Sequence, residues 1–117
     1  MTKKIFSVSE NDSVKKAIGI MEKHALSQLP VLEGGRSIGT ISERSVLASF
    51  GNGEKNPANV KVREVMEDSL PLIQENMPIG IVSQMLRFSP ALLVAKKGKI
   101  VGILAKSDLL KNLAKVR

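Results

Sequence analysis

The chain contains the stretch GRSIGTIS at residues 35–42 and a counterpart, GKIVGILA, 63 positions later at residues 98–105. The similarity continues on both sides at the same offset, pairing LPVL at 29–32 with LLVA at 92–95, and SVL at 45–47 with DLL at 108–110. A period this long excludes a solenoid of short repeats. The 117-residue chain is therefore a duplication of a unit of about half its length.

The first half predicts a strand, a helix, a hairpin and a second helix. In order, these elements cover residues 5–8, 14–21, 29–32 with 37–41, and the segment that follows Ser42. The first helix is predicted by apolar residues at positions i, i+3, i+4 and i+7, counted from Val14. Gly34 and Gly35 predict the hairpin turn because glycine tolerates the positive φ that tight turns require. Ser42 is a typical helix N-cap.

The second half repeats the same order of patterns. Its predicted elements cover residues 70–73, 81–86, 91–95 with 99–104, and a last helix from about Ser107. Pro78 is compatible with the first turn of its first helix, and Lys97-Gly98 forms the hairpin turn. Between the halves, residues 51–59 are polar and rich in Gly and Asn, which indicates a linker. Residues 60–66 are expected to add a short helix.

These patterns define two repeats, residues 1–58 and residues 59–117, each with the element order β-α-β-β-α. A half of this size buries too little surface to be stable alone. We therefore expect one α/β (α+β) domain in which two repeats, related by a pseudo-twofold axis, pack sheet to sheet.

Composition narrows the classes of protein to consider. The chain has no cysteine and one histidine, which excludes disulfides and leaves little for a transition-metal site. No apolar run approaches the roughly 18 residues of a membrane span, and no signal peptide is evident at the N-terminus. We therefore expect a cytoplasmic protein without a membrane partner.

The net charge of +7 is uneven, with +2 in residues 1–58 and +5 in residues 59–117. A basic second half can attract nucleic acid, although a lysine-rich solvated surface is the favoured explanation. Three Phe, no Trp and no Tyr make base stacking on aromatic side chains an unfavourable mode.

The repeats resemble the CBS motif, named after cystathionine β-synthase. The resemblance covers nearly the whole chain and rests on SQLPV at 27–31, GTISERS at 39–45 and GKIVGILAKSD at 98–108. It implies a regulatory pair of repeats with two clefts that bind adenosine-containing ligands such as AMP, ADP, ATP or S-adenosylmethionine. It also implies a signature, Gly-x-x-Thr/Ser-x-x-Asp, in which the Asp binds both ribose hydroxyls and the Thr or Ser binds phosphate or ribose.

Both signatures depart from that pattern. The first signature, residues 39–45, keeps Ser42 but has Ser45 in place of the Asp. The second signature, residues 102–108, keeps Asp108 but has Ala105 in place of the Thr or Ser. By resemblance, we expect a preferred cleft formed by Thr2, Phe6, Leu26, Ser27, Ala105, Lys106, Ser107 and Asp108. A second cleft, weaker or empty, would use Ser42, Glu43, Arg44, Ser45, Leu70, Pro90 and Ala91.

Each of these residues also has a purely structural interpretation. Asp108 suits the start of a helix through the helix dipole, Ser42 suits an N-cap, and Lys106 and Arg44 suit a solvated surface. His24 is expected to have a helix-end role.

No Gly-x-Gly-x-x-Gly, phosphate loop or nucleophile–base pair is present. We therefore expect a regulatory module rather than an enzyme, with no catalytic or metal site and no required cofactor. Three functions stay open: an adenosine-ligand sensor, a nucleic-acid-associated module such as the regulatory part of a larger archaeal regulator, and a pure dimerisation module. By resemblance, a homodimer is expected.

Overall fold

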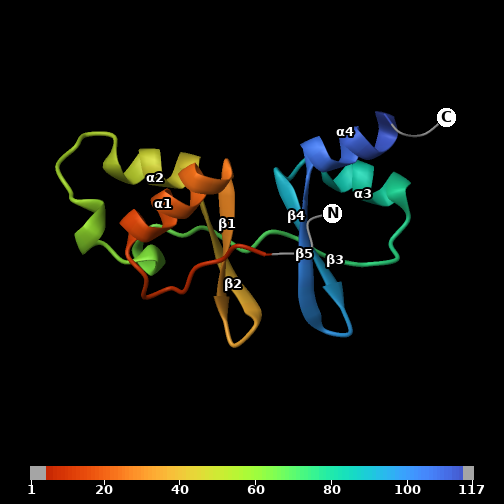
Figure 1. The fold of residues 1–117 in the computed structure, drawn as a ribbon, viewed down its shortest axis with the longest axis horizontal. Helices are drawn as coiled ribbons and strands as arrows, with labels where there is room; N and C mark the ends of the chain where they lie inside the picture. The colour runs from red at the N-terminus through yellow and green to blue at the C-terminus, as the bar shows by residue number, and fades with distance from the viewer. Residues whose placement is uncertain (1–4, 115–117) are drawn as a thin grey trace. The chain divides into compact units, whose positions relative to one another are not determined.

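The computed structural model describes residues 5–114 and divides the chain into two compact units (Figure 1). The first unit comprises Phe6–Ser69, and the second begins at Leu70 and also takes in Ile5. Within the described residues, no helix is long and apolar enough to cross a membrane. The mixed α/β content agrees with the predicted fold class.

The first unit contains two helices, a hairpin and two short 3₁₀ turns. In chain order, these are α1 (Val14–His24), β1 (Gln28–Glu33), β2 (Arg36–Ser42), α2 (Glu43–Phe50), η1 (Pro57–Asn59) and η2 (Val62–Glu64). The predicted strand at 5–8 is wrong as a strand, because only Val8 pairs with β1, through a single parallel bridge to Val31. The chain leaves the sheet edge there because it turns at Ser9, whose backbone N–H donates to the Asp12 carboxylate.

Local sequence signals explain the ends of α1 and the hairpin. The Ser13 side chain caps α1 by accepting a hydrogen bond from the Lys16 N–H. The predicted stripe faces inward, with Val14, Ala17 and Met21 buried. The β1–β2 turn has φ of 58° and 81° at its two glycines, as the Gly-Gly pair predicts.

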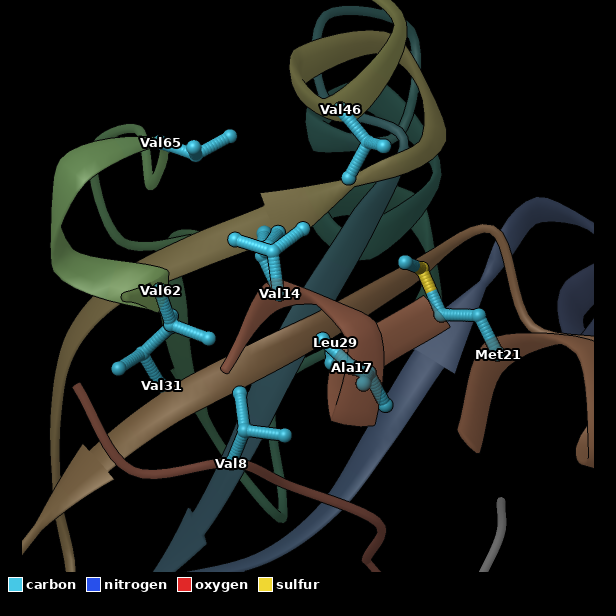
Figure 2. Packing of buried hydrophobic residues seen from close by; sticks show 10 residues of the cluster. Val8, Val14, Ala17, Met21, Leu29, Val31, Val46, Val62 and Val65 are labelled. Carbon is cyan, nitrogen blue, oxygen red and sulfur yellow. The ribbon is translucent and has the colours of Figure 1, made fainter. Parts of the chain in front are cut away.

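The core of the first unit includes residues that the sequence analysis assigned to the second repeat (Figure 2). Val62 is 0% exposed and Val65 is also buried, and both lie in one cluster with Val14, Leu29 and Val31. Backbone hydrogen bonds hold this segment in place, including one of 2.8 Å from the Val62 N–H to Asp12. The compact unit therefore extends to Ser69, because these valines find their apolar partners among α1 and β1. The division into repeats after residue 58 stays a prediction. The expected helix at 60–66 is reduced to the 3₁₀ turn η2.

The second unit is a three-stranded sheet with two helices. Its elements are β3 (Leu72–Gln74), α3 (Ile79–Met85), β4 (Ala91–Lys96), β5 (Lys99–Ala105) and α4 (Lys106–Ala114). The short β3 runs parallel to β4, and β4 and β5 form the antiparallel hairpin. The hairpin turn places Lys97 at φ 52° and Gly98 at φ 79°, which repeats the geometry of the first hairpin.

Two apolar clusters lie on the two faces of β4. One cluster contains Leu92 and Val94 and includes Val82 of α3 and Leu109 of α4, while the other contains Ala91 and Leu93. The predicted stripe of α3 is partly wrong, since Ile81 is 51% exposed. The helix begins at Ile79 and is only seven residues long, so Val82 and Leu86 alone reach the core fully.

Candidate functional site

The first signature closes the β2–α2 junction with a reciprocal pair of hydrogen bonds. The Ser42 hydroxyl accepts from the Ser45 N–H at 3.1 Å, and the Ser45 hydroxyl accepts from the Ser42 N–H at 3.0 Å. The Ser45 hydroxyl also donates to the Ser42 carbonyl at 3.0 Å. A hydroxyl has a single proton, and Ser45 is buried. The Ser45 hydroxyl therefore uses its proton within the helix cap. The structural interpretation of Ser42 as an N-cap is confirmed.

The second signature makes the equivalent bond with a carboxylate. Asp108 Oδ2 accepts from the Ala105 N–H at 2.9 Å, and these two residues lie 63 positions after Ser45 and Ser42. Asp108 therefore has a structural role, because its carboxylate bonds the backbone at the start of α4. A carboxylate has about four acceptor positions and a hydroxyl has two, so this cap leaves Asp108 with more acceptor capacity than Ser45.

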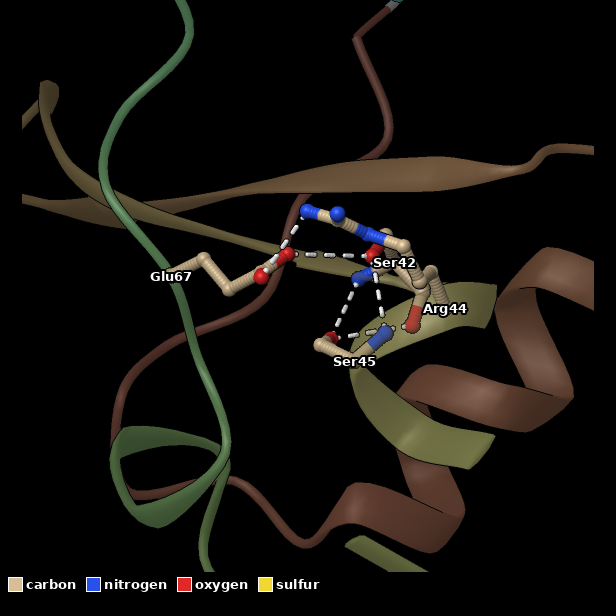
Figure 3. A network of polar contacts seen from close by, with 4 residues as sticks. All are labelled: Ser42, Arg44, Ser45 and Glu67. Carbon is tan, nitrogen blue, oxygen red and sulfur yellow. Dashed lines mark hydrogen bonds and ion pairs between the residues drawn. The ribbon is translucent and has the colours of Figure 1, made fainter. Parts of the chain in front are cut away.

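Glu67, which sequence reasoning missed, contacts two residues of the first signature (Figure 3). Glu67 Oε2 lies 3.0 Å from Nη2 of Arg44, and its Oε1 accepts a hydrogen bond of 3.4 Å from the Ser42 hydroxyl. Glu67 lies 25 positions beyond Ser42, near the beginning of the sequence assigned to the second repeat. No local pattern signals this contact, because it arises only when that segment folds back against β2.

The backbone fixes the position of Glu67. Its N–H donates to the Thr40 carbonyl at 2.8 Å, and its carbonyl accepts from the Thr40 N–H at 2.9 Å. Gly39 permits this approach, since a Cβ at that position would lie 2.7 Å from the Met66 sulfur and 3.0 Å from the Glu67 carbonyl oxygen. Gly39, the glycine of the first signature, is therefore required by packing, because a side chain there would clash with the segment that carries Glu67.

The remaining residues predicted for the preferred cleft lie in both units. In the first unit, Phe6 stacks on His24 with ring centroids 3.8 Å apart, which agrees with the helix-end position expected for His24. In the second unit, Lys106 and Ser107 are exposed on the first turn of α4. Thr2 lies outside the described residues. The assembly of these residues into one cleft stays a prediction.

The residues predicted for the second cleft are also divided between the units. Leu70 and Ala91 are buried in one cluster of the second unit, and Ala105 packs against the same cluster. Pro90 is exposed next to Ala91. Their participation in the second cleft stays a prediction.

The first unit also has an apolar groove between α1 and α2, with a volume of about 570 Å³. It is lined by Ile18, Met21, Glu22, Ala25, Leu26, Ser27, Glu43, Val46 and Leu47. It therefore brings together Leu26 and Ser27, predicted for the preferred cleft, and Glu43, predicted for the second cleft. The carboxylates of Glu22 and Glu43 make this groove unfavourable for a phosphate and suitable for apolar or basic groups. Among the residues described, no three side chains gather as a metal site.

The two units are thus copies of one α/β module, and each hairpin runs directly into a polar helix start. The CBS domain family model matches residues 1–52 and 62–115. These matches cover most of the chain, so the chain belongs to the CBS domain family and carries a tandem pair of CBS domains. CBS domains are regulatory modules.

Known relatives agree with this assignment. An uncharacterized protein of Methanocaldococcus jannaschii is 26% identical over 117 residues, and the CBS domain-containing protein YhcV of Bacillus subtilis is 28% identical over 114 residues. The alignments cover 96% of this chain in both cases, but 42% of the first relative and 81% of the second. This chain thus spans less than half the length of the Methanocaldococcus relative.

A solved structure shares the fold. It is described as a signal-transduction protein with CBS domains from Burkholderia ambifaria, and it superposes with a TM-score of 0.86 at 23% identity. The match covers 98% of this chain and 87% of that one.

Proposed function

We propose that this CBS pair senses an adenosine-containing ligand, and that the Asp108 carboxylate is its principal ribose contact. One observation carries the proposal: Asp108 is held at the start of α4 by the 2.9 Å bond from the Ala105 N–H to its Oδ2. A bond of this kind fixes the orientation of the side chain. A fixed carboxylate, with acceptor capacity beyond the cap, suits the two hydroxyl donors of a ribose.

The charges around the two helix starts support the same ranking. Lys106 is exposed in the first turn of α4, where the positive end of the helix dipole also favours an anion. The corresponding residue of α2 is Glu43, and Glu67 adds a second carboxylate there. A nucleotide phosphate is therefore favoured at α4 over α2.

A ligand regulates such a module only if it binds one conformation better than another. We propose that occupation at α4 changes the packing of the repeats or of an oligomer, and that a partner protein or a further domain responds to that change.

Isothermal titration calorimetry with AMP, ATP and S-adenosylmethionine tests the ligand assignment. The informative variant is Asp108→Asn, because the Asn side-chain oxygen can still accept from the Ala105 N–H while the negative charge is lost. We expect it to weaken binding by about tenfold, the effect of roughly 1.4 kcal/mol. Asp68→Asn is the control, since it removes the same charge from an exposed residue. Equal affinity of Asp108→Asn and the parent would refute the role of Asp108.

A second candidate function, assembly as a homodimer, is favoured by the groove of the first unit. Leu47 on its rim is 69% exposed, and its neighbours in the groove are mainly apolar. In the second unit, Leu110 of α4 is 65% exposed and lies between the exposed Lys106 and Lys111. An apolar residue flanked by lysines complements an apolar groove with carboxylates, so we propose a second copy of this chain as the occupant.

Light scattering tests this assembly. We expect Leu47→Asp to shift the parent dimer towards monomer at the same protein concentration. We expect Leu72→Asp, at a strand residue that is 55% exposed and lies outside the groove, to leave the dimer unchanged. A monomeric parent chain, or an unchanged dimer in the Leu47 variant, would reject the groove as the interface.

A further inference from the structure

The first signature differs from the second in more than its missing Asp, because the Glu67 carboxylate contacts the side chains of Ser42 and Arg44. Its two carboxylate oxygens separately contact the Ser42 hydroxyl, at 3.4 Å, and the Arg44 guanidinium, at 3.0 Å. These are the groups of the first signature with the chemistry to bind a phosphate: a hydroxyl donor at a helix start and a cation in the first turn of the helix.

We infer that Glu67 is a specificity-determining residue, whose carboxylate excludes phosphate-bearing ligands from the start of α2. The inference rests on the proposed function, in which the two signatures are ligand-binding sites. A phosphate approaching Ser42 meets a carboxylate already in the position it would take, and it meets Arg44 with its charge already paired.

The backbone makes this exclusion a fixed property of the unit rather than a chance surface contact. Glu67 is held by both hydrogen bonds of its pairing with Thr40, and Gly39 lets the segment approach closely. The Cα of Glu67 therefore cannot retreat without breaking that pairing. Only its side chain is able to rotate away from Ser42 and Arg44.

The ion pair itself is exposed, with 83% of the Arg44 side chain and 43% of the Glu67 side chain accessible. Exposed pairs of this kind add little to stability. Removal of the Glu67 side chain should therefore leave the fold intact, since the contacts that hold this segment are made by its backbone. Substitution of Glu67 can therefore change ligand selectivity without unfolding the first unit.

The start of α2 is thus selective against anions, and a ligand that occupies it has no phosphate. Adenosine and AMP form the matched pair of probes, because they share the nucleoside and differ only in the phosphate. The exclusion predicts that Glu67 lowers the affinity for AMP specifically and leaves the affinity for adenosine nearly unchanged.

The experiment measures AMP and adenosine binding by calorimetry in the Asp108→Asn background, which weakens the site at α4. Adding Glu67→Ala is expected to strengthen AMP binding by about tenfold, since it removes one unit charge a few ångströms from the phosphate and releases the guanidinium of Arg44. Adenosine binding is expected to change less than about twofold on the same argument. Asp68→Ala is the control, because it removes a neighbouring exposed carboxylate.

A third substitution tests whether the gain in AMP affinity depends on the Arg44 guanidinium. In the variant that combines Glu67→Ala with Arg44→Ala, the gain in AMP affinity should disappear, because the released cation is absent. Circular dichroism and thermal unfolding confirm that each variant keeps the parent fold.

The outcomes also separate the inference from the proposed function. Loss of AMP binding in Asp108→Asn tests the site at α4, while gain of AMP binding with Glu67→Ala tests the exclusion at α2, and either result can occur without the other. The inference is overturned if Glu67→Ala leaves AMP affinity unchanged or weakens it, or if Asp68→Ala produces the same gain.

Discussion

Replacement of Val62 by alanine tests whether the segment of residues 59–69 belongs to the core of the first unit. Val62 is 0% exposed and lies among the buried residues of α1 and β1. The substitution removes two methyl groups, each contributing about 0.8 kcal/mol of transfer free energy. The unfilled space adds a further penalty, because the surroundings relax only in part. We therefore expect the free energy of unfolding to fall by about 2–3 kcal/mol.

Urea unfolding followed by circular dichroism measures this change. The transition midpoint should fall while the m-value stays constant, since the same surface is exposed on unfolding. Arg63→Ala is the control, because Arg63 is the exposed neighbour within the same 3₁₀ turn, and surface substitutions of this kind stay within about 0.5 kcal/mol. If Val62→Ala also costs less than about 0.5 kcal/mol, the segment is a loosely packed linker and the reasoning fails.

Four further substitutions test a strand, a helix, a helix cap and a turn. Gly39→Ala should destabilise the first unit by about 1–3 kcal/mol, because its Cβ would meet the backbone of Glu67, whereas Gly19→Ala, with open space around it, should stabilise α1 by about 0.5–1 kcal/mol. Ser45→Ala should lower the free energy of unfolding by about 1 kcal/mol, since it removes the hydroxyl that bonds both the N–H and the carbonyl of Ser42 at the start of α2. Lys97→Asn should raise stability by about 0.5 kcal/mol, because Asn adopts the positive φ of this turn more readily than Lys. Thermal and urea unfolding measure all of them, and an effect of opposite sign would contradict the assigned backbone geometry.

The elements of the chain could be predicted where the signal is local. The apolar spacing from Val14 to Met21 predicted α1, and the Gly34-Gly35 pair predicted the first hairpin, because helical periodicity and positive φ are set by neighbours in sequence. Ser42 was predicted as an N-cap for the same reason. The predictions were weaker where the element is short. Ile81 was expected inside and is exposed, since a seven-residue helix has too few turns for its apolar spacing to establish which side is buried.

The two signatures themselves came from sequence alone, through the duplication and the resemblance of both copies to one motif. What the tertiary structure added is the distinction between their polar groups. Ser45 and Asp108 make the same backbone bond at a helix start. The Ser45 hydroxyl also donates its one proton to the Ser42 carbonyl, whereas the Asp108 carboxylate keeps further acceptor positions.

The sequence by itself determined that this chain is a tandem pair of CBS domains with unequal signatures, because repeated local patterns and residue identities carry that information. Only the tertiary structure decided that residues 59–69 pack with the first unit and that Glu67 reaches Ser42 and Arg44. Those contacts join residues more than 20 positions apart in sequence. They form because Val62 and Val65 are buried among α1 and β1, and the burial of those two apolar side chains brings the Glu67 carboxylate to the start of α2.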